Sequence, residues 1–384
     1  MPVISDSGQV VIVGGGILGT MHAVMARRLG YAVTHLEREP EGRGASVRNF
    51  GLVWVSGRRA GGELALALRA RELWAEIAAL APGTGFRPHG SLTVATSEAE
   101  LAVLREAAEL PDAKEREFEL LSPAEVRSVN PALQGDFRGG LWCRADAIVE
   151  PRLALPALRA SLAGPGGAGY DWLPGVEAVE VAANGVRDSR GTWHRGDLVV
   201  LCTGANFTGV AGPHLAASGA LARDAGGTGL RRVRLQMLQT APLPGSLTTS
   251  VADGDSLRYY PAFEVPSRDA LPPQAPVAAA NRAQLLLVQR LDGSLTVGDT
   301  HEYDEPFGFD VTEDAYEHLL ARASALLGTA LPPVRRRWAG VYSEVTGTTA
   351  RYHRSAVAPG VVLVTGPGGR GMTCSPAIAE ETFQ

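Results

Sequence analysis

Three glycines and one acidic residue near the start of the chain have the spacing of a dinucleotide-binding turn. Gly14, Gly16 and Gly19 form a GxGxxG frame, and Glu37 follows at close to the usual distance. In such turns the first glycine permits a sharp bend, the second lets the backbone approach a pyrophosphate, and the third lets a helix pack closely on a strand. An acidic residue about 20 positions later accepts hydrogen bonds from a ribose. These residues predict that the protein binds a dinucleotide.

The elements around this frame would position it for that role. The apolar β-branched residues 10–13 predict a buried parallel strand, a helical pattern covers about 18–29, and a second apolar strand covers 32–36. The N-terminus of the helix would present free N–H groups and a partial positive charge to phosphates. The acid at Glu37 argues against a 2′-phosphate, whereas the motif leaves FAD and NAD open.

A second glycine-rich loop follows directly, at residues 42–54. Ser46 and its neighbouring N–H groups would make a further phosphate contact, and residues 49–51 would run beside a flat ring. The alternative for such a loop is a simple surface turn. Its position directly after the dinucleotide unit favours the binding interpretation.

The chain returns to the same kind of pattern at its end. The apolar strand 361–364 leads into a glycine-rich loop, and Ser375 followed by Pro376 predicts the N-cap and first position of a helix. One nucleotide-binding lobe therefore contains both the beginning and the end of the chain. The segments between, with their alternating strand patterns, would form a second lobe.

Local signals predict several elements of the middle of the chain. Ser97 and Ser122 are predicted to cap helices, and Ser122 has the spacing of a capping box. Asp292 and Gly293 predict a tight turn between strands at 285–290 and 294–298. Further predictions are strands at 176–181 and 235–240, a loop rich in proline and alanine at 265–280, and a solvent-exposed basic triplet at 335–337.

Composition bounds the class of protein. The 384 residues are 45% apolar and 20% charged, as in an ordinary soluble globular protein with more than one lobe. A formal net charge of −5 gives no case for binding nucleic acid or an anionic membrane. Three cysteines form no disulfide framework, which fits a cytoplasmic location. The sequence predicts no signal peptide, membrane span, internal repeat or metal site.

Three motifs together resemble the D-amino-acid oxidase superfamily of FAD-dependent amine oxidoreductases, which includes glycine oxidase and sarcosine oxidase. They are the GxGxxG frame with Glu37, the loop at 44–51 and the loop at 366–373. Four further stretches resemble the subgroup associated with aminophosphonate breakdown, and these are 45–51, 258–261, 298–301 and 337–342. The resemblance covers nearly the whole chain.

The resemblance implies an α/β fold with a Rossmann-like FAD-binding domain and a second, mainly antiparallel-sheet (α+β) substrate domain. The FAD-binding domain would comprise residues 1–85, 141–215 and 335–384, and the substrate domain residues 86–140 and 216–334. The cofactor-binding residues implied by the motifs are Gly14, Gly15, Gly16, Gly19, Glu37, Arg38, Ser46, Asn49, Gly51, Val176, Gly204, Gly368, Arg370, Gly371, Met372 and Thr373.

Two departures from the family pattern bear on the substrate and on the cofactor linkage. Glycine oxidase has an arginine that grips the substrate carboxylate shortly after its Trp-Ala-Gly, whereas this chain has Val341 and Tyr342 there. Sarcosine oxidase tethers its flavin through a cysteine, whereas no cysteine occurs between Cys202 and Cys374, so we expect noncovalent FAD. The candidate substrate-binding residues are Arg370, Tyr342, Tyr260, Arg258 and His301.

The function implied is oxidation of the carbon–nitrogen bond of a small amine to an imine, which water hydrolyses to an aldehyde and an amine. The substrate class implied by the subgroup is an N-methyl or hydroxy derivative of 2-aminoethylphosphonate, and the electron acceptor would be oxygen or a quinone. The flavin carries the chemistry, so no side chain is named as catalytic. The alternatives are oxidation of glycine, sarcosine or D-amino acids, a nicotinamide-dependent dehydrogenase, and a non-catalytic dinucleotide-binding subunit.

Overall fold

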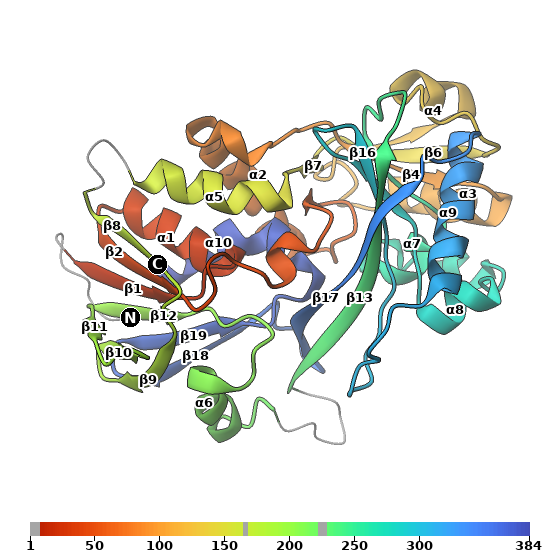
Figure 1. Cartoon of the computed structure of the whole chain (residues 1–384). Coiled ribbons are helices and arrows are strands. Elements are labelled where there is room, and N and C mark those ends of the chain that lie inside the picture. The colour runs from red at the N-terminus through yellow and green to blue at the C-terminus, as the bar shows by residue number, and fades with distance from the viewer. Residues whose placement is uncertain (1–7, 164–167, 222–228) are drawn as a thin grey trace.

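Two large sheets organise the chain in the computed structural model, which describes residues 8–163, 168–221 and 229–384. One sheet has six strands and the other eight, and they lie in separate lobes (Figure 1). Strand β1 and helix α10, from the two ends of the chain, lie in the same lobe. The predicted α/β fold class is confirmed, with a Rossmann-like sheet beside a mainly antiparallel one.

The six-stranded sheet has the order β18-β19-β12-β1-β2-β8. All neighbouring pairs are parallel except β18 with β19, so one edge strand runs against the rest. The strands are β1 (Gln9–Val13), β2 (Ala32–Glu37), β8 (Tyr170–Pro174), β12 (Leu198–Leu201), β18 (His353–Ala358) and β19 (Val361–Thr365).

Both faces of this sheet are covered, which explains its continuous apolar strands. Val10 and Ile12 pack in a core with residues of the helices, while Val11 and Val13 pack in a separate core on the other face. Figure 1 shows the helices above the sheet and the small sheet of β9, β10 and β11 below it. These elements are α1 (Ile17–Arg28), α2 (Gly62–Leu80), α5 (Pro151–Leu162), α10 (Gly371–Phe383), β9 (Ala178–Ala182), β10 (Gly185–Asp188) and β11 (Trp193–Arg195).

The eight-stranded sheet has the order β17-β13-β16-β15-β14-β4-β6-β5, and every pair except β14 with β4 is antiparallel. Its strands are β4 (Ser91–Ala95), β5 (Phe118–Leu121), β6 (Gly139–Cys143), β13 (Gly229–Pro242), β14 (Ser250–Ala252), β15 (Leu286–Gln289), β16 (Ser294–Gly298) and β17 (Val334–Thr346). A short pair, β3 (Leu52–Val53) with β7 (Ala147–Ile148), is separate from both large sheets.

Alternation along the strands assigns the two faces of the eight-stranded sheet. Val233, Leu235 and Met237 share one core, whereas Leu238 packs with Leu319 of α9 in another. Figure 1 shows α3, α4, α8 and α9 around the side of this lobe that is far from the six-stranded sheet. The remaining helices are α3 (Glu98–Ala108), α4 (Pro123–Val129), α6 (Gly212–Ala217), α7 (Ser256–Tyr259), α8 (Pro276–Asn281) and α9 (Glu313–Leu327).

Most local predictions are confirmed, and several are wrong. Ser97 and Ser122 both form complete capping boxes, the hairpin around Asp292 forms, and the triplet 335–337 is exposed. The strand predicted at 176–181 begins only at Ala178, β8 was not predicted, and the loop at 265–280 contains the start of α8. Strand β13 has 14 residues, far more than 235–240, because its length follows from pairing with the distant β17.

The start of the last helix was also predicted wrongly. Helix α10 begins at Gly371 with Arg370 as its N-cap, so Pro376 lies inside the helix and Ser375 does not cap it. Proline removes the N–H that would bond to the carbonyl of Met372. The side chain of Trp74, on α2, donates to that carbonyl from Nε1 at 3.0 Å instead. A long-range contact therefore makes an internal proline tolerable.

The division of the chain into five domain segments stays a proposal. Strand pairing favours two changes to the predicted boundaries, because β6 and β17 both belong to the eight-stranded sheet. The proposed boundary near 140 would then move to the end of β6, and the one near 334 to the end of β17.

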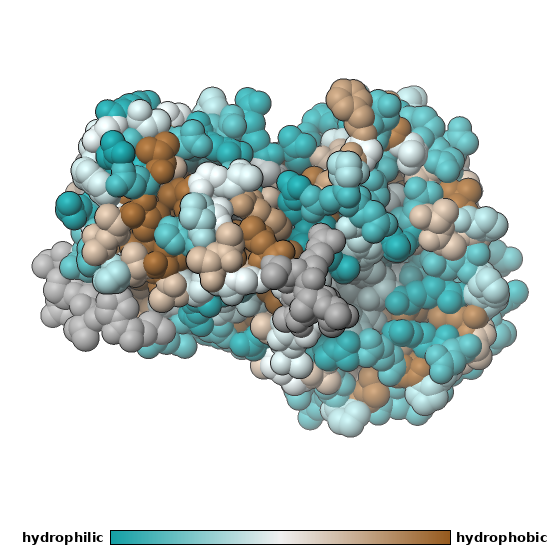
Figure 2. Space-filling model, turned by 90° about the horizontal axis from the view of Figure 1, so that it is seen from below, coloured by the Kyte–Doolittle hydropathy of each residue, from teal (hydrophilic) through white to brown (hydrophobic). Residues whose placement is uncertain are grey.

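The two lobes differ in hydropathy on the face that Figure 2 shows. Figure 2, which shows one face, has hydrophobic residues gathered on the lobe of the six-stranded sheet and a mainly hydrophilic surface on the other lobe.

Among the helices in the described ranges, none combines the length and the apolar character that a bilayer span requires.

Two buried histidines make the lobe of the six-stranded sheet sensitive to acid. Burial lowers the pKa of His22 and of His35 to about 4. The two hydrogen-bond partners of the His35 ring suit its neutral form. Its Nε2 lies 2.9 Å from the carbonyl oxygen of Gly14, and its Nδ1 lies 3.1 Å from the hydroxyl of Tyr170. Below pH 6.5 the unfolded chain therefore takes up protons that the folded protein excludes.

We expect the free energy of unfolding to fall as the pH drops from 6.5 towards 4. Each pKa unit corresponds to about 1.36 kcal/mol, so each histidine would contribute about 2 kcal/mol of loss by pH 5. Urea unfolding measured at several pH values checks this. His35→Gln can still donate to Gly14 and should show a shallower pH dependence; an unchanged slope would contradict the assignment.

Candidate functional site

A cavity of about 740 Å³ lies at the junction of the two sheets. It is bounded by the carboxyl ends of β1, β2, β12 and β19, where Gly14, Glu37 and Gly204 line it, and by Met237 and Tyr342 from the eight-stranded sheet. Open α/β sheets bind ligands at the carboxyl ends of their strands, and a volume of about 300–1,000 Å³ is usual for a ligand site. The cavity is therefore the candidate active site.

The turn after β1 leaves no room for side chains. Gly14 has φ +109°, and a Cβ atom there would lie 2.2 Å from the carbonyl oxygen of Cys202 on β12. A Cβ at Gly19 would lie 1.9 Å from the carbonyl oxygen of Gly14. Gly14 and Gly16 line the cavity, whereas Gly19 packs behind it. The glycine spacing thus lets β1, β12 and α1 meet closely around an open backbone.

The acidic residue at the end of β2 also supports this turn. Glu37 lines the cavity, and its carboxylate accepts from the N–H of Gly15 at 2.6 Å and of Glu39 at 2.9 Å. A carboxylate has about four acceptor positions, so it can still accept from ribose hydroxyls. Val176 and Arg38 line the same region, but the N–H of Val176 already donates to the Glu37 carbonyl oxygen at 2.8 Å, which leaves only its own carbonyl oxygen for a ligand.

The loop after Arg43 closes over the start of α1. Ser46 lines the cavity, and its Oγ accepts from the N–H of Ile17 at 2.9 Å. Asn49 also lines it, and its Oδ1 accepts from the N–H of Gly51 at 2.6 Å. Gly51 packs behind the lining with φ +72°, because a Cβ there would lie 2.1 Å from the Val149 carbonyl oxygen.

The N-terminus of α10 forms another part of the wall. Gly368, Gly371 and Met372 line the cavity. Thr373 lies behind them, where its Oγ1 accepts from the backbone N–H of Trp54 at 2.9 Å. The first turn of a 13-residue helix carries a partial positive charge, which favours negative charge on a ligand beside it.

Two arginines and one glutamate line the cavity together. Arg370 Nη1 lies 3.2 Å from Glu63 Oε2, and Arg58 Nη1 lies 3.9 Å from Glu63 Oε1. Arg370 also donates from Nε to the carbonyl oxygen of Pro367 at 3.0 Å. We call these three side chains the arginine cluster; it carries one net positive charge.

Aromatic side chains form the wall on the side of the eight-stranded sheet. Tyr342, Tyr260 and His301 line the cavity, and so does Tyr259. Tyr259 is 37% exposed, and its ring stacks on His301 with centroids 4.3 Å apart. Burial raises the pKa of Tyr260 and of Tyr342, so their hydroxyls are protonated at neutral pH and can donate hydrogen bonds.

Arg258 lies outside the cavity lining, and we remove it from the candidate set. Its guanidinium donates to the carbonyl oxygen of Pro272, and its Nε lies 3.7 Å from Asp255. Neighbouring residues on the short helix α7 point in different directions, so Tyr259 rather than Arg258 reaches the cavity.

Sequence reasoning missed several lining residues. Tyr259 and Asp299 stand inside the stretches 258–261 and 298–301, so their neighbourhood was visible in the sequence although their direction was not. Trp54 ends the loop at 42–54, which the sequence also indicated, whereas Arg58, Glu63 and Gln284 come from separate segments that no motif indicated. These missed residues are Trp54, Arg58, Glu63, Tyr259, Gln284 and Asp299.

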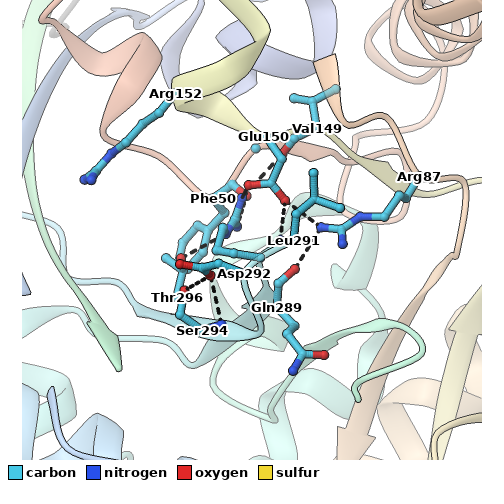
Figure 3. Close-up of polar contacts among 12 residues, drawn as sticks. Phe50, Arg87, Val149, Glu150, Arg152, Gln289, Leu291, Asp292, Ser294 and Thr296 are labelled. Carbon is cyan, nitrogen blue, oxygen red and sulfur yellow. Dashed lines mark hydrogen bonds and ion pairs between the residues drawn. The ribbon is translucent and has the colours of Figure 1, made fainter. Parts of the chain in front are cut away.

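A buried ion-pair network ties this site to the hairpin of β15 and β16. Glu150 accepts from Arg87 Nη2 at 2.8 Å and lies 3.7 Å from Arg290 Nη1. Arg290 also donates to the carbonyl oxygen of Phe50, which lines the cavity. Figure 3 shows Arg87 directed towards the Glu150 carboxylate, while Arg152 points away. The network thus holds the loop before β3 against the second lobe.

The chain matches the protein family described as DAO, FAD dependent oxidoreductase, over residues 9–384. The chain belongs to this family. Glycine oxidase from Bacillus cereus ATCC 14579 has a similar fold, with a TM-score of 0.75 and 20% identity over 97% of this chain and 95% of that one. The predicted superfamily of FAD-dependent oxidoreductases is therefore confirmed.

Curated relatives match over shorter stretches. An opine oxidase subunit of Rhizobium meliloti is 28% identical over 194 residues, which are 46% of this chain and 50% of that protein. Mitochondrial sarcosine dehydrogenase of Mus musculus is 30% identical over 151 residues, 38% of this chain and 16% of that protein. The matches therefore span half or less of these relatives.

The described residues fit FAD. The turn after β1 is kept free of side chains by Gly14 and Gly16, Glu37 is a ribose acceptor, and the cavity continues from there to the first turn of α10 and to Tyr342. FAD requires an acceptor for its ribose, an open backbone for its pyrophosphate and a positive helix end for its ring, which gains negative charge.

Replacing Glu37 by alanine should weaken FAD binding. A charge-assisted hydrogen bond contributes about 1.5–3 kcal/mol, so we expect a loss of roughly ten- to a hundredfold in affinity. Titration of the apoprotein with FAD measures this. Glu37→Gln keeps the shape of the side chain without its charge, and its FAD affinity should lie between those of the wild type and of Glu37→Ala. Unchanged affinity in Glu37→Ala would place the ribose contact elsewhere.

Proposed function

We propose that the protein oxidises the carbon–nitrogen bond of a small amine that also carries an anionic group. The observation that carries this is the arginine cluster, which places one net positive charge in the cavity wall beside the N-terminus of α10. The names of the curated relatives, for sarcosine and for opines, support an amine as the reacting group.

Bound FAD would supply a two-electron acceptor for a hydride from the carbon next to a neutral amine nitrogen, the nitrogen would lose a proton to solvent, and water would hydrolyse the resulting imine. Arg370 and the first turn of α10 would stabilise negative charge on the cofactor. Arg58 and Arg370 would hold the anionic end of the substrate. The aromatic wall of Tyr259, Tyr260 and Tyr342 would exclude water.

Within this class we infer a small aminophosphonate, an N-methyl or hydroxy derivative of 2-aminoethylphosphonate. The subgroup resemblance supplies the class. A phosphonate is tetrahedral and offers three acceptor oxygens, so it suits donors from several directions, such as Arg58, Arg370 and Tyr260. Glu63 already lies against Nη1 of Arg370. This disfavours a paired, coplanar set of hydrogen bonds from the Arg370 guanidinium to a substrate carboxylate. Glycine, sarcosine and D-amino acids remain the alternative substrates.

A nicotinamide-dependent dehydrogenase and a non-catalytic subunit are weaker candidates. Membership of an FAD-dependent family overturns the nicotinamide hypothesis. Flavin bleaching by an amine would exclude a non-catalytic subunit.

Oxygen or a quinone remains the proposed electron acceptor, and reoxidation of the bleached protein by oxygen or by a soluble quinone decides between the two.

The test is anaerobic mixing of the purified protein with aminophosphonates, N-methylated amines, opines and amino acids while flavin absorbance is followed. We expect an aminophosphonate to reduce the flavin fastest. Arg370→Met should lower both substrate affinity and reduction rate, while the matched variant Arg258→Met, outside the cavity, should change neither. If glycine, sarcosine or a D-amino acid reduces the flavin faster than every aminophosphonate, the finer assignment is wrong.

We expect the FAD to be released by acid precipitation, because the predicted attachment is noncovalent. Cys374 is fully buried in the core, and burial raises the pKa of its thiol to about 11. Cys202 lines the cavity beside Gly14, where the ring is not expected. Absorbance of the supernatant measures released FAD. A yellow precipitate that resists extraction would show a covalent link.

A further inference from the structure

A buried carboxylate lies in the cavity wall. Asp299 directly follows β16, is 5% exposed and lines the cavity. Its Oδ1 accepts from Gln284 Nε2 at 3.2 Å, and its Oδ2 lies 4.0 Å from His301 Nε2. The Nδ1 of His301 lies 3.1 Å from the carbonyl oxygen of Arg282, to which it donates, so Nε2 is the nitrogen turned towards Asp299.

This carboxylate has fewer compensating contacts than other buried acids among the described residues. Asp253 pairs with Arg322 at 3.0 Å, and Asp146, which has no ion-pair partner among the described residues, accepts hydrogen bonds from Val55, Ser56 and Ser91. In the part of the chain that the structure describes, the only ion-pair partner of Asp299 is a histidine, at the limit of contact. Burying a carboxylate without a close cation is costly. Burial accordingly raises the pKa of Asp299, and His301 opposes this rise.

Gln284 adds a second acceptor at the same place. Its Nε2 is used by Asp299, and its Oε1 is buried with no hydrogen-bond donor among the described residues. The residue is 3% exposed and lines the cavity. Two neighbouring acceptors, one of them charged, are complementary to a cation with several N–H groups. The rings of Tyr259 and Tyr260 in the same wall also favour a cation.

We propose that Asp299 and Gln284 form the subsite that binds the ammonium group of the substrate, an assignment that rests on the proposed function. Tyr260, which lines the same cavity, is influenced by both charged groups: burial raises the pKa of its hydroxyl, Asp299 adds to the rise, and Arg58 opposes it. The cavity is therefore negative at one place and positive at another. A zwitterionic amine would bind in one direction, with its anion at Arg58 and Arg370.

The test compares ligands that differ only in the amine. The FAD-loaded protein is titrated anaerobically with 2-aminoethylphosphonate and with ethylphosphonate, and in a second pair with glycine and with acetate, by calorimetry. We expect the amine of at least one pair to bind ten- to a hundredfold more tightly than its amine-free partner, the effect of a charge-assisted hydrogen bond. Asp299→Asn should bring this ratio close to one without loss of FAD.

Glu302→Gln is the matched control, because it removes a carboxylate from the same segment that is already paired with Arg234. The ratio of the affinity for the amine to that for its amine-free partner should be the same in Glu302→Gln as in the wild type. The proposal is overturned if Asp299→Asn keeps the wild-type ratio, if the wild type shows no amine preference in either pair, or if it binds none of the four ligands. If Asp299→Asn does not fold, Gln284→Met decides: it should lower the ratio in the same direction, and an unchanged ratio overturns the proposal.

The same measurements separate this proposal from the proposed function. If amines bind with a preference that depends on Asp299 but none reduces the flavin, the ammonium subsite stands and amine oxidation falls. If amines reduce the flavin and the Asp299→Asn ratio is unchanged, amine oxidation stands and the subsite falls.

Discussion

Replacing Gly14 by alanine should lower FAD affinity by at least about thirtyfold. The residue has φ +109°, where a side chain is strained, and its new Cβ would lie 2.2 Å from the Cys202 carbonyl oxygen. Strain of about 1–2 kcal/mol and overpacking of about 1–3 kcal/mol would both fall on the turn that faces the cavity. Relief requires β1 and β12 to separate at the carboxyl edge where the dinucleotide would bind.

Gly30→Ala provides the matched control for this prediction. Gly30 also has a positive φ, +89°, but a Cβ there would meet nothing within 4 Å. It follows α1 at the end far from the cavity-lining turn. This variant should lose only about 1–2 kcal/mol of stability and keep its FAD. FAD content after purification and titration of each apoprotein measure the effect; equal FAD loss in both variants would show that backbone strain alone, not the clash, is responsible.

Arg290→Met should lower the free energy of unfolding by about 3–5 kcal/mol, the usual result of removing one partner of a buried ion pair. The guanidinium is 8% exposed and donates from Nε to Thr296 Oγ1 at 3.0 Å as well as to Phe50. Burial lowers the pKa of Arg290 to about 10, so the group remains charged at neutral pH. The variant would leave Glu150 with Arg87 as its one ion-pair partner among the described residues and the Phe50 carbonyl without this donor.

The exposed pair of Arg59 and Glu264 is the control for the buried network. Its two hydrogen bonds, 2.7 and 3.0 Å, are shorter than the 3.7 Å contact of Arg290 with Glu150, but its side chains are 59% and 43% exposed. Arg59→Met should therefore cost less than about 1 kcal/mol. Urea unfolding with comparison of midpoints and slopes tests both variants. Similar losses in the two would mean that burial adds nothing to the ion pair.

Local chemistry explains what could be predicted. The glycines of the first turn are constrained by strands that neighbour each other in the sheet, so their spacing alone indicates the turn. Ser97 and Ser122 cap helices through atoms three residues away, so four letters of sequence contain the whole interaction. The acid at Glu37 is likewise positioned by the strand that it ends.

The elements that were missed depend on partners far along the chain. The length of β13 comes from pairing with β17, about a hundred residues later, and the proline inside α10 is tolerated because Trp74 of α2 reaches its freed carbonyl. Sequence propensity describes a segment by itself, whereas strand length and helix boundaries respond to such contacts.

The sequence by itself determined the dinucleotide turn and the family, because each is written in residues close together or in motifs that keep their spacing. Only the tertiary structure decided the composition of the pocket. Arg58, Glu63 and Arg370 meet from different segments, Gln284 joins Asp299 across a hairpin, and Tyr259 faces the cavity where Arg258 does not. Side-chain direction and charge pairing arise when the two sheets pack, and no single segment contains that information.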